Sequence, residues 1–348
     1  MELADFMGQP GEWLSGTGPE ADIVISTRLR LARNVQGFPF LTRAGADVKR
    51  RIQEHVSTAI RQTELGGQLE IFDVGNAEPV DRQFLVERHL ISKELANSEG
   101  DRSVAFEADE VRSIMVNEED HLRIQILKSG FQAEAAWRDI NRIDDVLESA
   151  IDYAYSPHYG YLTSCPTNVG TGMRVSIMFH LPALVMTRQI DKVFQAVSKI
   201  HLAVRGLFGE GTQASGDFYQ ISNQVTLGIS EAEILDKIEK VVPKIIQYER
   251  NIREMIENES RKVIEDKVWR ALGTLQSARS IQSEETLNLL STVRLGVNMH
   301  LIEDVSIQTV NELFIQSQPA HIQKLEGRVL DQDERDMARA AYIRRRLN

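Results

Sequence analysis

The sequence predicts an α+β fold in which an antiparallel sheet flanked by helices is followed by an all-α domain. Up to about residue 228, short strand patterns mix with helical apolar stripes, and apolar and polar residues alternate strictly over 122–126. From residue 257 onward only helical patterns remain. A chain of 348 residues is long enough for two domains, which we place at residues 1–255 and 256–348.

Composition and charge narrow the class of protein. The chain is 42% hydrophobic and 26% charged, and its formal net charge of −11 argues against general nucleic-acid binding. No apolar run approaches the ~20 residues of a membrane span, and the start of the chain lacks the basic segment of a signal peptide. The single cysteine excludes an internal disulfide framework. We therefore expect a cytoplasmic protein without direct contact to nucleic acid or membrane.

Arginines follow a short strand predicted at residues 23–26. Arg28, Arg30 and Arg33 lie within six residues, and guanidinium groups match phosphate oxygens with paired hydrogen bonds. An exposed basic turn is the simpler interpretation of this segment taken alone. A site for a polyanion is the alternative.

An acidic run at residues 118–120 joins a strand predicted at 113–116 to the alternating strand at 122–126. Neighbouring carboxylates repel one another, so a purely structural reason for three of them is weak. A solvated acidic turn remains an alternative on this segment alone.

Residues 165–174, Cys-Pro-Thr-Asn-Val-Gly-Thr-Gly-Met-Arg, predict a site loop because they contain few apolar side chains. Pro166 restricts the backbone, and Gly170 and Gly172 would let it approach a ligand. Cysteines are more often inert packing groups, but Cys165 opens a polar loop, which favours a role in a site. The strand predicted at 175–179 places Arg174 where the loop meets the sheet.

A glycine-rich segment begins at Arg205 and contains Glu210. Such a turn can hold phosphate with backbone N–H groups, although glycines also end helices. Neither the P-loop pattern nor the H-R-D and D-F-G pair of protein kinases occurs in the sequence.

The remaining patterns supply the elements between these segments. A capping box at Ser230 and Glu233 starts a helix in which Pro243 predicts a kink. The predicted helices span 46–64, 81–96 (with His89), 131–155, 186–204, 230–256, 257–275, 283–295, 305–316, 318–325 and 331–347, and the other predicted strands span 69–72 and 104–106, with a hairpin over 216–223 and 225–228.

These segments together resemble the ATP:guanidino phosphotransferases, the family of creatine and arginine kinases. Residues 165–171 resemble the family's signature loop, and residues 117–123 resemble its catalytic segment. Residues 26–30 match its Ser-x-Arg-x-Arg element, and residues 205–210 match its Arg-Gly-x-x-Gly-Glu loop. The resemblance covers about 22–228 and implies a phosphagen-kinase-like catalytic domain that transfers phosphate from ATP to a guanidine.

The resemblance also implies residue roles. A guanidinium has a pKa of roughly 13.8 and is not nucleophilic while protonated, so Glu119 and Glu210 are expected to hold it and accept its proton, with Cys165 nearby and Arg174 aligning the phosphates. Mg²⁺ is expected to be held through the ATP phosphates, without metal ligands from the protein. The implied ATP-binding residues are Ser26, Thr27, Arg28, Leu29, Arg30, His89, Arg123, Arg174, Val175, Ser176, Ile177, Met178, Arg205, Gly206, Leu207, Phe208, Gly209 and Glu210.

The sequence departs from creatine and arginine kinases in two features, and in both it resembles the bacterial protein-arginine kinases. It has a C-terminal helical domain that the small-molecule kinases lack, and it lacks a domain that they have. The helical domain that precedes the Ser-x-Arg-x-Arg element in the small-molecule kinases is missing, which implies a more open acceptor pocket. The last predicted helix contains a run similar to the R-D-x-x-R-A element that binds phosphoarginine, with Arg335, Asp336, Arg339 and Ala340 at its positions. A solvated, salt-bridged helix face is the simpler alternative for that run.

The resemblance therefore implies a protein-arginine kinase that transfers the γ-phosphate of ATP to arginine side chains of proteins. It also implies a role in stress response and protein quality control, in which the marked proteins go to a Clp-type protease. Expected partners are arginine-bearing protein substrates, an activator protein, a stress-response repressor and the Clp unfoldase, and the C-terminal domain is expected to form a homodimer. Two alternatives stay open: a kinase of a free guanidino compound, and a non-catalytic phosphoarginine-binding adaptor.

Overall fold

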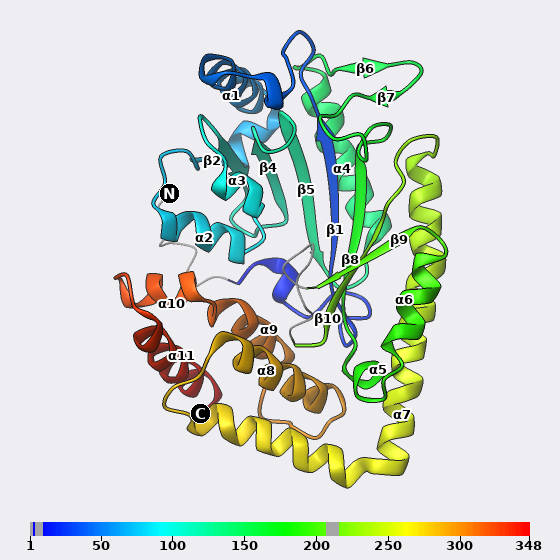
Figure 1. Cartoon of the computed structure of the whole chain (residues 1–348), viewed down its shortest axis with the longest axis vertical. Helices are drawn as coiled ribbons and strands as arrows, with labels where there is room; N and C mark the ends of the chain where they lie inside the picture. Colours follow the sequence, from blue (N-terminus) through cyan, green and yellow to red (C-terminus); the bar gives the residue numbers. More distant parts are fainter. Residues whose placement is uncertain (1–2, 4–9, 207–215) are drawn as a thin grey trace.

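The computed structural model describes residue 3, residues 10–206 and residues 216–348 (Figure 1). Four predicted ATP-binding positions, Leu207, Phe208, Gly209 and Glu210, lie outside the described residues.

The centre of the molecule is an eight-stranded sheet in the order β2-β3-β4-β5-β1-β8-β10-β9, with antiparallel pairing between neighbours (Figure 1). A short separate hairpin, β6–β7, follows α4 in the chain. The strands are β1 Val24–Arg33, β2 Glu70–Asp73, β3 Ser103–Phe106, β4 Arg112–Val116, β5 Leu122–Ser129, β6 Tyr155–Ser156, β7 Gly160–Tyr161, β8 Met173–His180, β9 Leu202–Gly206 and β10 Phe218–Asn223.

The helices lie on both faces of the sheet, and the last ones of the chain gather at one end of the molecule (Figure 1). The α-helices are α1 Ala46–Gln62, α2 Pro79–Glu87, α3 Lys93–Asn97, α4 Ala133–Glu148, α5 Pro182–Met186, α6 Ile190–Ser198, α7 Glu231–Ser277, α8 Ser283–Asn298, α9 Ile307–Gln316, α10 Pro319–Glu326 and α11 Gln332–Leu347, and short 3-10 helices lie at Glu12–Leu14, Leu41–Arg43 and Glu64–Gly67. This arrangement confirms the predicted α+β class and the helical C-terminal region.

The two faces of the sheet differ because successive side chains of a strand point to opposite sides. Leu29, Leu31 and Ile124 have no exposed surface and lie on the face that α4 covers by packing against β1 and β5. Arg33 shares this face and forms a buried ion pair of 2.7 Å with Asp144 of α4. The opposite face carries the polar residues of the same strands.

Helix α7 links the sheet to the C-terminal helices. It begins at the predicted capping box, in which Ser230 and Glu233 bond each other's backbone. Pro243, where the sequence predicts a kink, keeps helical backbone angles, and the break falls at Ser260, with φ of −139°. The buried apolar core continues from the sheet into α8 and α9, where Phe314 meets Phe218 edge to face at 4.5 Å.

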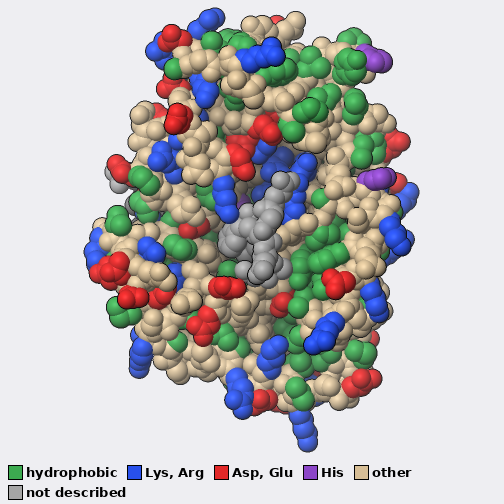
Figure 2. Space-filling model, viewed as in Figure 1, with side chains coloured by type: hydrophobic (Ala, Val, Ile, Leu, Met, Phe, Trp, Pro, Cys, Tyr) green, Lys and Arg blue, Asp and Glu red, His purple; other side chains and the backbone are tan. Residues whose placement is uncertain are grey.

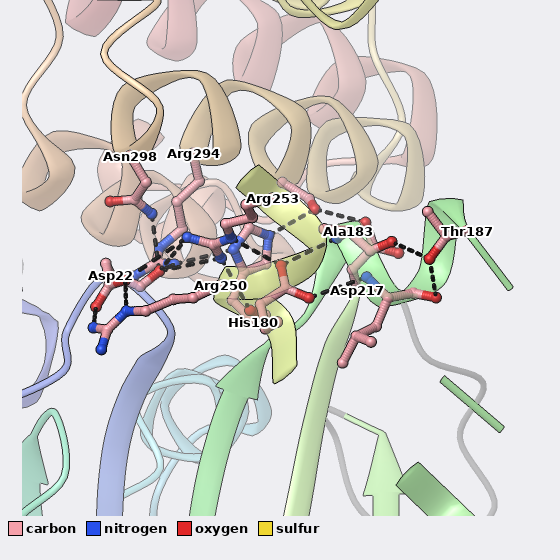
Figure 3. A network of polar contacts seen from close by, with 12 residues as sticks. Asp22, His180, Ala183, Thr187, Asp217, Arg250, Arg253, Arg294 and Asn298 are labelled. Carbon is pink, nitrogen blue, oxygen red and sulfur yellow. Dashed lines mark hydrogen bonds and ion pairs between the residues drawn. The ribbon is translucent and has the colours of Figure 1, made fainter. Parts of the chain in front are cut away.

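A polar network fastens α8 to the end of the sheet (Figure 3). The guanidinium of Arg294 donates to the backbone oxygens of Ala21 and Asp22 and to Nδ1 of His180. The Asp22 carboxylate in turn pairs with Arg250 of α7 at 2.7 Å. Arg294 therefore joins α8 to acceptors at the end of the sheet.

Several predicted boundaries are wrong in an informative way. The strand predicted at 23–26 extends to Arg33, so the arginines lie within it. The helix predicted at 131–155 ends at Glu148, before hairpin β6–β7. Beyond β10, residues 225–228 form no strand, and β10 pairs with β8 and β9 instead.

Two long predicted helices are each interrupted. Residues 81–96 divide into α2 and α3, and His89 lies between them with a positive φ of 59°. Residues 186–204 divide into the end of α5, α6 and strand β9. Short apolar stretches fit both helical and strand periods, so pattern alone did not place these breaks. Among the described residues, no helix is both long and apolar enough to cross a membrane.

Candidate active site

The polar face of the sheet brings together arginines that lie far apart in the sequence. Arg30 of β1 is paired in register with Arg174 of β8, while Ala32 pairs with Arg123 and Gln220 pairs with Arg205. Paired residues of antiparallel strands point to the same side. We call the set of Arg28, Arg30, Arg123, Arg174 and Arg205 the arginine face. Figure 2 shows basic side chains gathered in a hollow at the middle of the molecule.

The guanidinium groups of the arginine face repel one another. Burial, followed by the charges of Arg123, Arg174 and Arg205, lowers the pKa of Arg28 to about 10. Burial and the neighbouring arginines also lower the pKa of Arg30 well below its usual value, and Arg30 forms no hydrogen bond or ion pair with any residue that the structure describes. A buried charge without a partner is costly, so this face is built for an anion.

The three carboxylates of the acidic run have different surroundings. The Glu118 side chain is fully buried and accepts hydrogen bonds from Ser92 and Arg123, both at 2.6 Å. Its other oxygen accepts the backbone N–H of Glu119 at 2.6 Å. Glu118 therefore positions Arg123 and Glu119, a role that the sequence did not indicate.

Asp120 ties the acidic turn to the signature loop. Its Oδ1 accepts the Nδ2 hydrogen of Asn34 and the backbone N–H of Ser164, each at 2.6 Å. The Asp120 side chain is almost fully buried. Its role in the described residues is thus to hold two loops together.

Glu119 is the carboxylate of this run that faces solvent, with 41% of its side chain exposed. It lies 3.3 Å from Arg123 and accepts a hydrogen bond from Asn168 of the signature loop at 3.3 Å. Partial burial raises its pKa above the usual range, against the opposing charge of Arg123, and Glu118 and Asp120 raise it further. A carboxylate held in this way suits the binding of a cation and the acceptance of a proton.

The signature loop lies beside Glu119, as the sequence predicts. Cys165 is half-buried, and its Sγ lies 3.0 Å from the hydroxyl of Thr167. At Gly170 a Cβ would lie 2.2 Å from the Thr226 carbonyl, and at Gly172 it would lie 2.6 Å from the Ala32 carbonyl. These glycines let the loop pack against the protein's own backbone.

The predicted ATP-binding residues divide between the two faces of the sheet. Ser26, Arg28, Ser176 and Met178 share the arginine face. The side chains of Thr27, Leu29, Val175 and Ile177 belong to the opposite face, where all four are fully buried.

A mostly apolar pocket extends from the arginine face towards the C-terminal helices. His89 forms one wall, and its ring meets that of Trp13 edge to face at 5.2 Å. Burial, with the charges of Arg28 and Arg30, lowers the pKa of His89 to about 3, so the ring is neutral. The pocket is lined by Trp13, Leu14, Ile25, Ser26, Arg28, His89, Leu127, Ser176, Met178, Phe218, Gln220, Asn311, Phe314 and Ile315.

Helix α9 contributes the last three of these lining residues. The sequence did not predict that contribution, because no local signal connects α9 to strands almost 100 residues or more away in the chain. Gln220, whose side chain accepts a hydrogen bond from Arg28, was also missed. The signal available in the sequence was the alternation of the polar Gln220 with the apolar Ile221.

The arginines of the last helix lie away from the arginine face. Arg339 is buried and donates to the carbonyl oxygens of Ser317, at 2.7 Å, and Ile281, at 2.8 Å, and it also pairs with Asp336. Arg335 is half-buried and donates to the Leu330 carbonyl at 2.9 Å. Arg339 is thus supplied with acceptors from the protein, whereas Arg335 has donors to spare.

Family models match both parts of the chain. Residues 51–252 match the model described as "ATP:guanido phosphotransferase, C-terminal catalytic domain". Residues 261–348 match the model described as "Protein-arginine kinase McsB C-terminal domain". The two matched segments meet near the break in α7.

Solved structures resemble the sheet and its helices. A duplicated taurocyamine kinase from Schistosoma mansoni is 27% identical, with a TM-score of 0.62, over 68% of this chain and 34% of that chain. This chain therefore spans about a third of that protein. A lombricine kinase, 24% identical over 70% of this chain and 71% of its own, shares the fold with a TM-score of 0.61.

Curated relatives match the full length. The protein-arginine kinase of Desulforamulus reducens is 48% identical over 100% of this chain and 99% of its own length. That of Bacillus subtilis is 44% identical over 100% of this chain and 96% of its own. The chain therefore belongs to the protein-arginine kinases, ATP-dependent enzymes of the ATP:guanido phosphotransferase family.

Proposed function

We propose that the arginine face holds the triphosphate of ATP while Glu119 holds the arginine side chain of a protein substrate beside it. The observation that carries this proposal is Arg123, which belongs to the arginine face and also lies 3.3 Å from Glu119. A polyanion and a guanidinium would meet at this boundary. Phosphoryl transfer depends mainly on such positioning and on charge stabilisation.

The ionised carboxylate of Glu119 would accept the proton that the guanidinium nitrogen loses as it attacks the γ-phosphorus. A new N–P bond forms, and the bond to the bridging oxygen of ADP breaks. The raised pKa of Glu119 makes it a stronger base than an ordinary glutamate. Glu210 is proposed as the second carboxylate, and Cys165 as a further contact to the guanidinium.

Mg²⁺ is proposed to enter with ATP and to be held by the phosphates. The ion would neutralise phosphate charge beside the arginines. The apolar pocket that ends at His89 is proposed for the adenine base.

The biological setting remains part of the proposal. Phosphorylated proteins would be delivered to a Clp-type protease in the cytoplasm during stress, with an activator protein, a stress-response repressor and the Clp unfoldase as partners. We place the division between the two domains near residue 255 and propose that the second domain forms a homodimer. We also propose that Arg335, Asp336, Arg339 and Ala340 bind phosphoarginine.

The test compares transfer of phosphate from Mg-ATP to a denatured protein with transfer to free arginine. Products are measured by mass spectrometry at neutral pH, because the N–P bond is labile in acid. Phosphoarginine in the protein alone is the expected result, and Glu119→Gln should abolish it while the melting temperature stays unchanged. Transfer to free arginine alone would make the chain a metabolite kinase, and transfer to neither would favour the adaptor.

A further inference from the structure

A second hollow lies beside the signature loop, whose residues Gly170 and Thr171 line it. It is formed by hairpin β6–β7, the end of α4 and the segment before α7. Tyr155 and Tyr159 line it with 58% and 52% of their surface exposed. Figure 2 shows hydrophobic side chains at the upper right, where Figure 1 places this hairpin. Exposed rings that gather around a hollow are typical of a binding surface.

The charged residues around this hollow indicate which kind of group it can bind. Glu148 and Glu231 line it, and neither carboxylate forms a hydrogen bond or ion pair with another side chain in the described parts of the chain. Among the described residues that line it there is no lysine or arginine. Aromatic faces beside unpaired carboxylates attract a cation on an aliphatic stem.

The same aromatic cluster already binds one guanidinium. The Arg33 guanidinium carbon lies 3.5 Å from the centre of the Tyr161 ring, and Tyr155 meets that ring edge to face at 5.3 Å. Arg33 occupies an inner ring, while the outer rings of Tyr155 and Tyr159 face solvent. The cluster is therefore chemically suited to a second cation from outside.

The hollow is joined to the candidate active site by a short piece of chain. Gly170 and Thr171 line it, and Asn168 of the same loop contacts Glu119 at 3.3 Å. Two residues of extended chain span at most ~7 Å. A polypeptide with its acceptor arginine at Glu119 would thus pass over the hollow within a few residues.

We propose that this hollow binds a second basic side chain of the protein substrate, a lysine or arginine near the acceptor arginine. The proposal rests on the function proposed above and adds a feature of the substrate to it. A basic segment satisfies both the rings and the carboxylates.

The experiment uses two peptides that contain one arginine and, at a fixed spacing from it, either lysine or acetyl-lysine. Acetylation keeps the length of the side chain and removes its charge. We expect the full chain to phosphorylate the lysine peptide with a kcat/KM about tenfold higher than that of the acetyl-lysine peptide, because its KM is lower. This difference is expected when two to five residues separate the lysine from the arginine. In the variant Tyr159→Ala/Glu231→Gln the two peptides should become equivalent, with kcat unchanged.

Matched variants test whether the preference for lysine depends on this hollow or on exposed rings and carboxylates elsewhere on the surface. Trp269→Ala/Glu259→Gln removes an exposed ring and an exposed carboxylate from α7 and should keep the preference for lysine. Tyr155→Phe/Tyr159→Phe keeps the rings and should also keep it. Equal use of both peptides by the unaltered chain, or a preference that survives Tyr159→Ala/Glu231→Gln, would overturn the proposal.

Binding of the same peptides without ATP is measured by fluorescence anisotropy. This measurement separates the proposed basic-residue site from the proposed phosphorylation reaction. A tenfold preference in binding without any transfer would refute the proposed phosphorylation and still support the basic-residue site. Transfer to both peptides without a preference in binding would support the kinase reaction and refute the site.

Discussion

The arginine face and the junction network are two arginine clusters that differ in their acceptors. At the junction, Arg294 donates to Asn311, to His180 and to the carbonyls of Ala21 and Asp22. On the arginine face, Arg30 forms no hydrogen bond or ion pair with the described residues. Burial and neighbouring guanidiniums lower pKa values in both clusters, to about 9 for Arg294 and about 10 for Arg28. Arg294, which is given acceptors, holds the fold together, whereas Arg30, which has none among the described residues, is left to bind a ligand.

The difference between the arginine face and the junction network predicts its largest effect at Arg30. Arg30→Met should lower kcat/KM by about a thousandfold, because a preorganised charge on the transferring phosphate is lost. The melting temperature should stay the same or rise, since a repelling charge is removed. Steady-state kinetics and thermal unfolding of the same preparation measure both effects. A clear loss of stability would place Arg30 with the structural arginines.

Arg294→Met should produce the opposite pattern. Removing this guanidinium takes the donor from the Ala21 carbonyl, from Oδ1 of Asn311 and from Nδ1 of His180, so we expect the free energy of unfolding to fall by about 3 kcal/mol. Urea denaturation measures this loss, and the KM for ATP should stay unchanged at a temperature where the variant is folded. Normal stability would mean that the network contributes little.

Glu118 offers a smaller test within the active site. Glu118→Gln keeps the shape of the side chain but removes the charge that holds Arg123, so kcat should fall about thirtyfold, or ~2 kcal/mol. Glu107→Gln is the matched control, because Glu107 forms a similar pair with Arg112 at 2.7 Å in another part of the sheet. An equal loss in the two variants would contradict a positioning role.

The last helix contains both kinds of arginine within one turn. Arg335→Ala should weaken binding of a phosphoarginine peptide about tenfold with little change in stability, since Arg335 has donors to spare. Arg339→Ala should lower the free energy of unfolding by about 2 kcal/mol, because the Ser317 and Ile281 carbonyls lose their donor. Calorimetry with the peptide and urea denaturation separate these effects. Unchanged peptide binding in Arg335→Ala would remove the phosphoarginine assignment.

The sequence predicted the fold class and the segments of the candidate site, but not which side chains face the ligand. In β1 the alternation of Arg28 and Arg30 with Leu29 and Leu31 already indicated a strand with one charged and one buried face. The five consecutive residues predicted as ATP contacts in β1, and the five in β8, include side chains of both faces, because the faces alternate with a period of two.

The sequence around the acidic run also could not show which of its three carboxylates faces solvent. Whether Glu118, Glu119 or Asp120 faces solvent depends on partners such as Ser92 and Ser164, which lie 26 and 44 residues away in the chain. The wall supplied by α9 and the acceptors of Arg294 are likewise long-range features. Periodicity describes a segment's own faces, and tertiary contacts decide what those faces meet.

Cys165 gives this chain a built-in reporter. It is the sole cysteine in the sequence and is partly accessible on the loop that contacts Glu119. A thiol-directed fluorophore would therefore attach at one position without any engineering of the background. Its emission would follow occupancy of the acceptor side of the site in real time, and protection of the thiol by a substrate would measure binding without any chemistry taking place.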